Sequence, residues 1–423
     1  MQIYVVKPGD TLFSIGRALG LAPGFLARYN GLQEPYRLAV GQSLLVLYPE
    51  QTVTVQPGDT LTSIAASAGT DVASLYRMNP NLSGSDRIYP GQILVTQLEQ
   101  AARRPAVVSG YAYPNVSERV LRGILPYAGA LAPFTYGFTA EGALVPMDDE
   151  RLLALAGACG VQPLLHLSTL TAAGAFSAAQ AAALLRDPAL QQTLAANVLQ
   201  TMLEKGYEGL DVDFEYLGRD LAEPYAAFIQ LLRDTLAPYG LPLITALAPK
   251  TSAAQPGTLY EGHNYASLST ASDAVLLMTY EWGYTYGPPM AVAPLKNVRE
   301  VAIYGVSEIS PEKIFLGIPN YGYDWTLPYE KGKTRAVSIG NEQAVNIARS
   351  YGAEIRFDSD AASPYFEYYD GTQKHIVWFE DARSISGKAS LIDELGIYGA
   401  GYWNGMRSFT QNWALMSALY NIR

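Results

Sequence analysis

The N-terminal part of the chain contains the same sequence pattern twice, and this repetition restricts how the region can fold. The segment Val6–Leu12, Val-Lys-Pro-Gly-Asp-Thr-Leu, returns as Val55–Leu61, Val-Gln-Pro-Gly-Asp-Thr-Leu. Further along each copy, Gly41–Gln42 corresponds to Gly91–Gln92. The pattern predicts a short strand, a Pro-Gly-Asp turn, two helices and a closing strand after Gly-Gln. The sequence therefore predicts two small β-α-α-β modules in tandem.

These two copies resemble the LysM domain, a small module that binds peptidoglycan and chitin, over residues 1–48 and 51–97. The resemblance implies a shallow groove for N-acetylglucosamine units between the loop after the first strand and the loop after the second helix. The Asp and Thr of each turn also have a simpler role, because both residue types cap a following helix. The implied glycan-binding positions are Gly9, Asp10, Thr11 and Asn30 in the first copy and Gly58, Asp59, Thr60 and Asn79 in the second.

A polar segment that ends in proline, residues 97–105, predicts a boundary between the two modules and the rest of the chain. From residue 105 to residue 423, apolar β-rich runs alternate with helical patterns, which is typical of repeated βα units around a parallel sheet. We therefore expect an α/β fold, a TIM (β/α)8 barrel. The expected strands lie near residues 107–111, 132–138, 162–168, 208–215, 241–247, 274–280, 314–320 and 397–403.

The longest helical pattern, Ser177–Lys205, is followed by Gly206, a residue type that favours helix C-termini. Between the seventh and eighth strands the chain is much longer than one βα crossover requires. This stretch contains a helical pattern after Asn341 and a hairpin signal at Tyr368–Thr372. We expect an inserted α+β lobe at about 326–378.

The composition excludes several classes of protein. Hydrophobic residues make up 49% of the chain and charged residues 16%, so the chain can build a large core and is not predominantly disordered. Lys and Arg number 29 against 39 Asp and Glu, a net charge of −10, which argues against nucleic acid as a partner. The lone Cys159 forbids an intramolecular disulfide, and His166, His263 and His375 lack metal-ligand spacing, so we expect no metal and no cofactor.

Membrane and export signals are also missing from the sequence. No apolar stretch approaches the ~18 residues of a membrane-spanning helix, so we expect no membrane partner. The first residues carry neither the basic leader nor the apolar core that is typical of a signal peptide. We therefore expect a protein that is made without a recognisable signal peptide.

Residues 206–216, Gly-Tyr-Glu-Gly-Leu-Asp-Val-Asp-Phe-Glu-Tyr, fall on the fourth expected strand. Side chains alternate between the two faces of a strand, so Asp211, Asp213 and Glu215 share one face and the apolar residues between them share the other. Three carboxylates inside a barrel raise the pKa of at least one of them, and packing alone favours branched apolar residues there. The pattern therefore predicts a catalytic site, with Glu215 at the C-terminal strand end where barrel active sites form.

The same run resembles the Asp-Gly-x-Asp-x-Asp-x-Glu signature of glycoside hydrolase family 18, the chitinase-like enzymes, and the resemblance covers essentially the whole predicted barrel. Glu208 stands where the first Asp of the signature usually lies, and Phe214 stands where Trp is common. Met278–Glu281 resembles the family's Met-x-Tyr-Asp on strand six, and Trp403 matches a sugar-stacking tryptophan on strand eight. The family's Ser-x-Gly-Gly on strand three is replaced by His166–Thr169.

This resemblance implies substrate-assisted hydrolysis with retention of the anomeric configuration. Glu215 would donate a proton to the glycosidic oxygen and later deprotonate water. The 2-acetamido oxygen of the substrate would attack the anomeric carbon, Asp213 would stabilise the oxazolinium ion, and Asp211 would tune Asp213. Tyr280 would hydrogen-bond the acetamido carbonyl, and Trp403 would form the apolar floor under the reacting sugar.

Four more side chains near the strand ends are candidates for substrate binding. They are Glu281, Tyr111, Tyr321 and Trp282. Aromatic rings with a polar atom suit sugars, although the same residue types also pack in cores.

LysM copies joined to this barrel are similar to the spore-germination N-acetylglucosaminidases, which degrade cortex peptidoglycan in spore-forming bacteria. The resemblance implies a cell-wall-associated enzyme at the spore coat or cortex surface that cleaves after N-acetylglucosamine in the cortex or its fragments. A chitinase that holds chitin through its LysM copies, and an inactive glycan-binding spore-coat protein, stay open as alternatives. Inactive relatives typically lose the acid, so the presence of Glu215 argues against the last. Oligomeric state, endo or exo action and the route to the substrate stay open.

Overall fold

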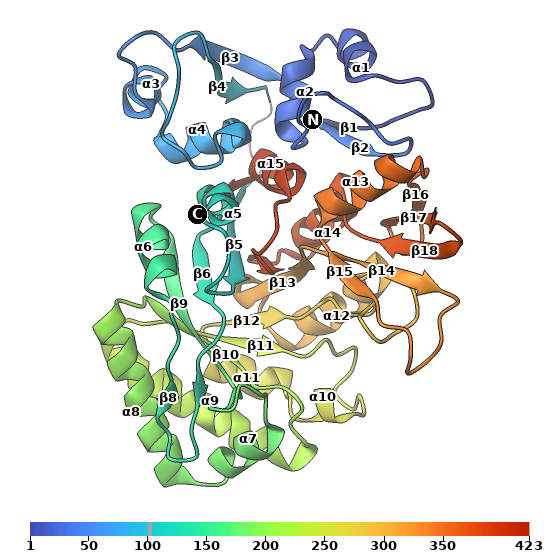
Figure 1. Cartoon of the computed structure of the whole chain (residues 1–423). Coiled ribbons are helices and arrows are strands. Elements are labelled where there is room, and N and C mark those ends of the chain that lie inside the picture. Colours follow the sequence, from blue (N-terminus) through green and yellow to red (C-terminus); the bar gives the residue numbers. More distant parts are fainter. Residues whose placement is uncertain (100–103, 423) are drawn as a thin grey trace.

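The structure of the chain, a computed structural model, describes residues 1–99 and 104–422. Two small N-terminal modules lie beside each other on one side of a barrel, and a lobe inserted into the barrel lies next to the first module (Figure 1). Residues 100–103, in the segment that was predicted as a domain boundary, lie outside the described residues. Within the described ranges, no helix has the length and apolar character needed to cross a membrane.

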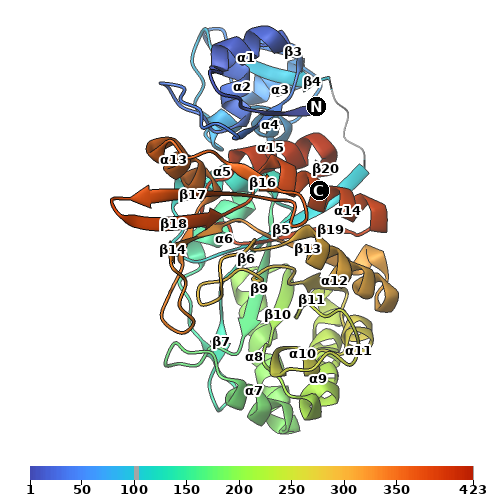
Figure 2. The ribbon, with the colours of Figure 1, turned by 90° about the vertical axis from the view of Figure 1, so that its right-hand side faces the viewer.

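Both N-terminal modules have the predicted β-α-α-β order, and Figure 2 shows them together at the same end of the molecule. The first helix of each module starts directly after the Pro-Gly-Asp turn because a threonine caps it. The Thr11 hydroxyl accepts the backbone N–H of Ser14, and the Thr60 hydroxyl accepts that of Ser63, both at 3.0 Å. The elements are β1 (Gln2–Val5), α1 (Leu12–Leu19), α2 (Pro23–Tyr29) and β2 (Ser43–Val46), then β3 (Pro49–Thr54), α3 (Leu61–Ser67), α4 (Val72–Met78) and β4 (Ile93–Leu98).

Eight parallel strands close into a barrel, which confirms the predicted TIM fold. Closure occurs because β5 pairs in parallel with both β6 and β19. A short strand, β20 (Tyr420–Ile422), pairs with the start of β5. The barrel strands are β5 (Arg104–Ala112), β6 (Ala130–Pro133), β9 (Gln162–Ser168), β10 (Gly209–Asp213), β11 (Leu243–Leu247), β12 (Ala274–Leu277), β13 (Ile314–Pro319) and β19 (Gly399–Trp403).

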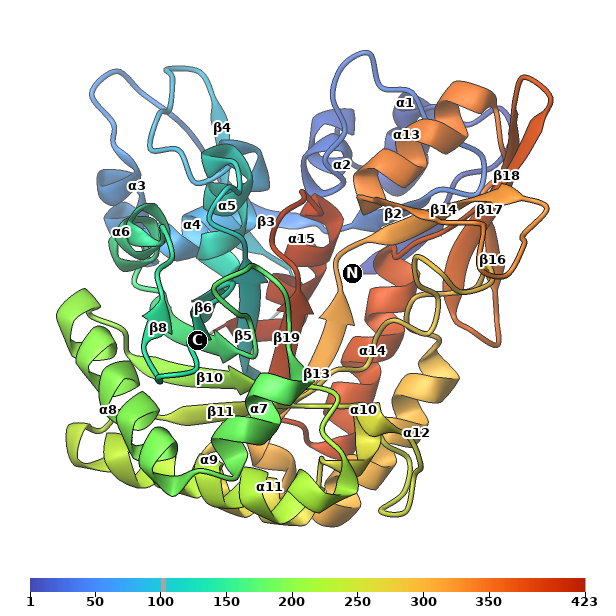
Figure 3. The same cartoon turned by 60° about the horizontal axis from the view of Figure 1, so that its bottom comes forward.

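Helices surround the strands, as Figure 3 shows for the side formed by α7 to α12. The helical pattern over 177–205 forms two helices, because Asp187 caps a new helix that begins at Pro188. The second helix ends, as predicted, at Gly206 with a left-handed φ of 75°. The helices are α5 (Glu118–Ile124), α6 (Glu150–Ala158), α7 (Ala178–Leu185), α8 (Pro188–Lys205), α9 (Ala222–Leu236), α10 (Thr258–Glu261), α11 (Tyr265–Ala271), α12 (Leu295–Glu308), α14 (Ala382–Leu395) and α15 (Thr410–Leu419), and a small hairpin joins β7 (Gly137–Phe138) to β8 (Leu144–Val145).

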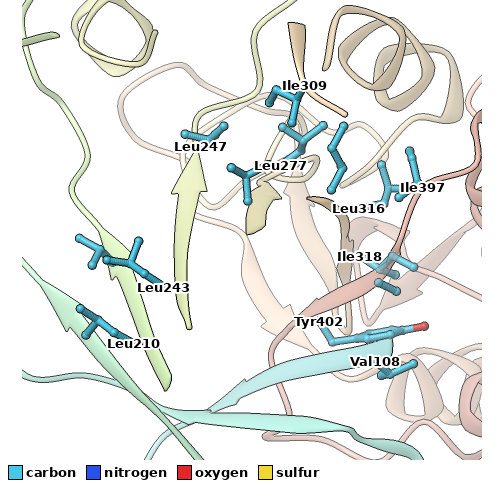
Figure 4. Close-up of a cluster of buried hydrophobic side chains, with 14 of the residues drawn as sticks. Val108, Leu210, Leu243, Leu247, Leu277, Ile309, Leu316, Ile318, Ile397 and Tyr402 are labelled. Atoms are coloured by element: carbon cyan, nitrogen blue, oxygen red, sulfur yellow. The ribbon is translucent and has the colours of Figure 1, made fainter. Parts of the chain in front are cut away.

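The main hydrophobic core lies between the outer faces of the strands and these helices. Leucines from successive strands, among them Leu210, Leu243 and Leu277, are fully buried there (Figure 4). A second, smaller cluster fills the barrel interior with residues such as Tyr111, Phe134 and Leu276. Burial of the outer apolar side chains stabilises the barrel. The barrel interior also contains buried polar side chains, such as Asp211.

The inserted lobe between β13 and β19 confirms the predicted α+β insertion, although its first strand starts at Gly322, four residues before the expected boundary. The predicted hairpin is present, with Asp370 paired to Gln373 across the turn. A five-stranded antiparallel sheet has the order β15-β14-β18-β17-β16. Its elements are β14 (Gly322–Leu327), β15 (Val337–Ile339), α13 (Asn341–Tyr351), β16 (Arg356–Asp358), β17 (Ser363–Asp370) and β18 (Gln373–Trp378).

The first N-terminal module is docked firmly on the barrel. Buried Gln411 of α15 donates from Nε2 to Asn30 Oδ1 at 2.7 Å and to the Ser43 carbonyl at 2.9 Å, while its Oε1 accepts the Ala382 N–H at 2.8 Å. Side chains of this module, including Leu45, belong to the main hydrophobic core. The first module therefore shares a core with the barrel, and this association is tighter than a flexible linker alone would give.

Candidate active site

The acid-bearing strand β10 has the alternation that the sequence predicts. Leu210, Val212 and Phe214 point outward and are fully buried, and Phe214 stacks on Tyr225 of α9 with ring centroids 5.7 Å apart. Asp211 is buried inside the barrel with 1% of its surface exposed. Asp213 is the last residue of the strand, and Glu215 lies two residues beyond it. Both side chains are partly buried. The strand thus presents its three acids as a row from the barrel interior toward its C-terminal mouth.

The neighbouring strand β9 adds a histidine that was not singled out as a site residue. His166 is paired in register with Asp211, and its Nε2 lies 3.5 Å from Asp211 Oδ2 and 4.0 Å from Asp213 Oδ2. On the other side of the ring, Nδ1 lies 2.5 Å from the Thr135 hydroxyl. Burial lowers the pKa of His166 to about 3, so the ring is neutral at neutral pH. When Nδ1 accepts from the Thr135 hydroxyl, Nε2 carries the ring proton and faces Asp211, whose two carboxyl oxygens have no hydrogen bond among the described residues.

The carboxyl groups of the row all have raised pKa values. Burial raises the pKa of Asp211 to about 7, and the nearby Tyr111 hydroxyl opposes that rise. Burial first, and then the charges of Glu215 and Asp211, raise the pKa of Asp213 well above its usual range. The pKa of Glu215 is raised by burial and by the charge of Glu281. Because these groups cannot all ionise together near neutral pH, the row can hold a proton for general acid catalysis.

Aromatic side chains from other strands close around the row. Tyr111 of β5 meets the His166 ring edge-on at 5.3 Å between centroids and the Trp403 ring at 5.6 Å. Tyr280, just beyond the end of β12, packs against the same interior cluster. The pKa of Tyr280 is raised by burial and then by the charges of Asp213 and Glu215, so its hydroxyl stays protonated and can donate near those acids. The structure therefore brings Tyr111, Tyr280 and Trp403 together with the acids.

The other predicted binding residues divide into two groups. The Glu281 carboxylate is at the mouth, where it accepts hydrogen bonds from the hydroxyls of Tyr321 and Tyr323. Trp282 packs against the main hydrophobic core, and its backbone N–H donates to the Val292 carbonyl at 3.0 Å. Glu281 and Tyr321 thus belong to the mouth, whereas the described contacts of Trp282 give it a packing role.

A groove with a volume of about 470 Å³ lies between the barrel and the inserted lobe. Trp403 and Glu281 line it, so it adjoins the reacting centre. The β5–α5 loop, the β19–α15 loop and the lobe supply the other lining residues, which are Tyr113, Asn115, Tyr321, Tyr323, Ser338, Asn404, Met406 and Arg407. Most of these were not predicted, because they come from barrel loops and lobe strands that only the folded chain brings together.

The metal-ligating potential of the site is low. Among the residues that the structure describes, no three or more His, Cys, Asp or Glu side chains are arranged to hold a metal ion. The acids instead face a neutral imidazole and tyrosine hydroxyls, which are groups that hold or move protons.

The LysM positions have mainly structural contacts. Asn30 and Asn79 are buried, and each side chain bonds the backbone of its own module: Asn30 Oδ1 accepts the Leu45 N–H at 2.7 Å, and Asn79 Oδ1 accepts the Val95 N–H at 2.8 Å. We therefore correct the expectation that these two asparagine side chains contact glycan, because their polar atoms are used within the fold. The loop and cap residues Gly9, Asp10, Thr11, Gly58, Asp59 and Thr60 stay accessible at the turns.

Comparisons with known proteins agree on the class of the barrel and of the modules. The sequence model of "Glycosyl hydrolases family 18" matches residues 170–406, and that of the LysM domain matches residues 4–46 and 53–96. The cortical fragment-lytic enzyme of Bacillus subtilis is 37% identical over 100% of this chain and 99% of its own length.

Solved structures show the same similarity. The crystal structure of the Bacillus cereus spore cortex-lytic enzyme SleL superimposes with a TM-score of 0.85 at 35% identity, over 100% of this chain and 98% of that one. A chitinase from Chromobacterium violaceum gives a TM-score of 0.68 at 26% identity, over 74% of this chain and 98% of that one.

Proposed function

The chain belongs to glycosyl hydrolase family 18 and carries two LysM domains, and on that premise we propose that it is an N-acetylglucosaminidase acting on spore cortex peptidoglycan or its fragments. The observation that carries the proposal is the row of Asp211, Asp213 and Glu215, whose pKa values are all raised at the barrel mouth. Relatives over the full length are named for the spore cortex and its fragments, which supports this substrate class.

Glu215 is the proposed general acid and base. It lies outermost in the row, and its raised pKa favours the protonated form that a leaving glycosidic oxygen requires. After the leaving group departs, the ionised Glu215 would take a proton from the attacking water. The acid and base roles thus belong to one carboxyl group, as in other substrate-assisted glycosidases.

The nucleophile in this proposal is the 2-acetamido oxygen of the substrate. Its attack on the anomeric carbon leaves a positively charged oxazolinium ion, which an ionised Asp213 would stabilise through the acetamido N–H. In this proposal Asp211 and Asp213 share one proton, because the charge of Asp211 raises the pKa of Asp213. The neutral His166 lies beside both. Tyr280, protonated and close to Asp213, would donate to the acetamido oxygen, and Trp403 would support the sugar ring.

The LysM modules are proposed to hold the glycan near the barrel. Because the first module shares a core with the barrel, a bound strand would be presented in a fixed orientation relative to the active site. We propose a cell-wall-associated protein at the spore coat or cortex surface.

The chitinase alternative is supported by the structural similarity to the Chromobacterium violaceum enzyme, which covers 74% of this chain. A chitinase and a cortex enzyme would use the same acids, so the two proposals differ only in the glycan that is bound beyond the reacting sugar.

The test uses two variants that flank the same strand, β10. Glu215→Gln removes the proposed acid, and we expect the rate on cortical fragments to fall by roughly two or more orders of magnitude while glycan binding persists. Glu208→Gln is the matched control, since Glu208 is exposed just before β10, at the opposite end of the strand, and this variant should stay active. Near-normal activity of a folded Glu215→Gln protein would overturn the proposal, and so would an inactive Glu208→Gln protein with an intact fold.

A further inference from the structure

One cation lies in the groove beside the reacting centre. Arg407, in the loop between β19 and α15, lines the groove together with Trp403. Its Nη1 donates to the Ser338 hydroxyl at 2.9 Å, and its Nη2 donates to the Ser338 carbonyl at 3.0 Å. The loop itself is anchored by Asn320, whose Nδ2 donates to the Arg407 carbonyl at 2.9 Å. The guanidinium group is therefore held in place on the groove wall, between the barrel and the inserted lobe.

This cation has no anionic partner among the described residues, none of which forms an ion pair with it. Glu281, the acid that shares the groove, is instead bonded to the hydroxyls of Tyr321 and Tyr323. A guanidinium group has five N–H donors. Ser338 accepts one hydrogen bond from Nη1 and one from Nη2 of Arg407. Partial burial of an unpaired charge is unfavourable, and desolvation lowers the pKa of Arg407 accordingly. The arrangement is suited to an incoming anion or carbonyl oxygen.

The groove also has a direction relative to the cleaved bond. Glu215 must lie at the leaving-group side of the reacting sugar, and Glu215 does not line the groove. Trp403, the proposed floor under the reacting sugar, does line it. This lining is the one expected if the groove receives the next sugar on the non-reducing side of the reacting sugar.

We propose that Arg407, positioned by Ser338, binds the lactyl carbonyl or carboxylate oxygens of the muramic residue that precedes the reacting N-acetylglucosamine. This inference rests on the proposed function and would make Arg407 the residue that selects peptidoglycan over chitin. In peptidoglycan the sugar next to N-acetylglucosamine carries a lactyl ether, whereas chitin offers only hydroxyl and acetamido groups at that place. A fixed guanidinium fork is well matched to paired oxygens. On a chain with a net charge of −10, it would also offset local repulsion of an anionic glycan.

A purely structural role for Arg407 makes a different prediction. A Cβ added to Gly340 would lie 3.3 Å from Arg407 Cδ, so the arginine side chain also packs against the lobe. If Arg407 only joined the lobe to the barrel, its loss would weaken the binding of both glycans equally.

The experiment measures binding by calorimetry in the Glu215→Gln background, so that no turnover is needed. The two probes are an N-acetylglucosamine–N-acetylmuramic acid tetrasaccharide with free lactyl carboxylates and a chitin tetrasaccharide of equal length. Adding Arg407→Gln should weaken binding of the muramic probe by about tenfold or more and binding of the chitin probe by much less. Arg407→Lys should restore part of the loss, and Arg122→Gln, which removes an exposed arginine paired with Glu118, should change neither affinity.

Equal weakening for both probes, or no weakening for the muramic probe, would overturn the inference. Absence of binding to the muramic probe before Arg407 is changed would overturn it as well. Because binding is measured without the acid, these results are separate from the activity test of Glu215, which alone decides the proposed catalytic function.

Discussion

Nε2 of His166 lies 3.5 Å from Oδ2 of Asp211, and both side chains are almost completely buried. The pair arises from the parallel register of β9 and β10, which places the two residues directly beside each other. A buried neutral imidazole that donates toward a carboxyl group favours its ionised form. We therefore expect a His166 ring that carries its proton on Nε2 to oppose the rise in pKa that burial imposes on Asp211.

Replacing His166 with Phe should test this role. The ring keeps its place between Tyr111 and Phe134, but the donor to the aspartates is lost. We expect the pKa values of the coupled aspartates to rise further, so the acidic limb of the pH–rate profile should move to higher pH, with a rate loss of roughly tenfold or more. His166→Gln, which retains a donor, should recover part of the shift. An unchanged acidic limb in a folded His166→Phe protein would contradict this role.

The raised pKa of Asp211 also predicts a pH-dependent stability. Its pKa is about 7 in the folded protein and near 3.8 when unfolded, so between these values the folded state binds the proton more tightly. Stability from this group is present below pH 3.8 and is lost as pH rises through about 7. The Asp211→Asn variant should not show this loss of stability. The difference between its free energy of unfolding and that of wild type should therefore increase from pH 4 to pH 8, by at most about 4 kcal/mol.

Urea unfolding of both proteins at the two pH values measures that difference. The opposite trend, a variant that loses relative stability at pH 8, would show that Asp211 is stabilised as the anion.

The docking of the first LysM module can be tested with two matched glycines. Both Gly41 and Gly91 precede the closing strand of their modules with left-handed φ values, +79° and +87°. A Cβ on Gly41 would lie 1.8 Å from the Ile355 carbonyl oxygen of the lobe, whereas a Cβ on Gly91 meets open space. Gly91→Ala should therefore cost only the backbone strain, about 1 kcal/mol.

Gly41→Ala carries the same strain and also disrupts the contact with the lobe, including the 2.9 Å bond from the Ile355 N–H to the Val40 carbonyl. We expect a larger fall in the thermal midpoint and faster hydrogen exchange of residues 353–357 in this variant alone. Equal effects of the two substitutions would mean that the module is not docked in solution.

The acid row and the repeats could be predicted because both are local patterns. Alternation on one strand was enough to place Asp211, Asp213 and Glu215 on one face, and an internal repeat was enough to identify two modules. His166 was dismissed as a metal ligand on its spacing, yet its position on an interior strand beside the acids was also visible in the sequence. A buried polar residue on a barrel strand would have been the signal for it.

Long-range packing could not be predicted from the sequence. Gln411 and Asn30 are distant in the chain, and nothing local indicates that they bond across the interface between a module and the barrel. Asn30 was expected to face glycan because of the LysM resemblance, whereas its Oδ1 accepts the Leu45 N–H of the closing strand. Arg407 gives no motif signal either, because its groove exists only where the barrel loop meets Ser338 of the lobe.

The identity of the sugar at new reducing ends tests the substrate-assisted mechanism and the proposed specificity together. Cortical fragments would be digested with the wild-type protein, reduced with borohydride and hydrolysed, with a Glu215→Gln digest as the blank. The attacking acetamido group must belong to the sugar on the non-reducing side of the cleaved bond, which a muramic lactam cannot supply. N-acetylmuramic acid has the acetamide, but its lactyl ether should be disfavoured in a pocket closed by Tyr280 and Trp403. We therefore predict new ends of N-acetylglucosamine, recovered as glucosaminitol. Recovery of muramitol instead would contradict the assignment of the cleaved bond and the pocket that Tyr280 and Trp403 are proposed to close around N-acetylglucosamine.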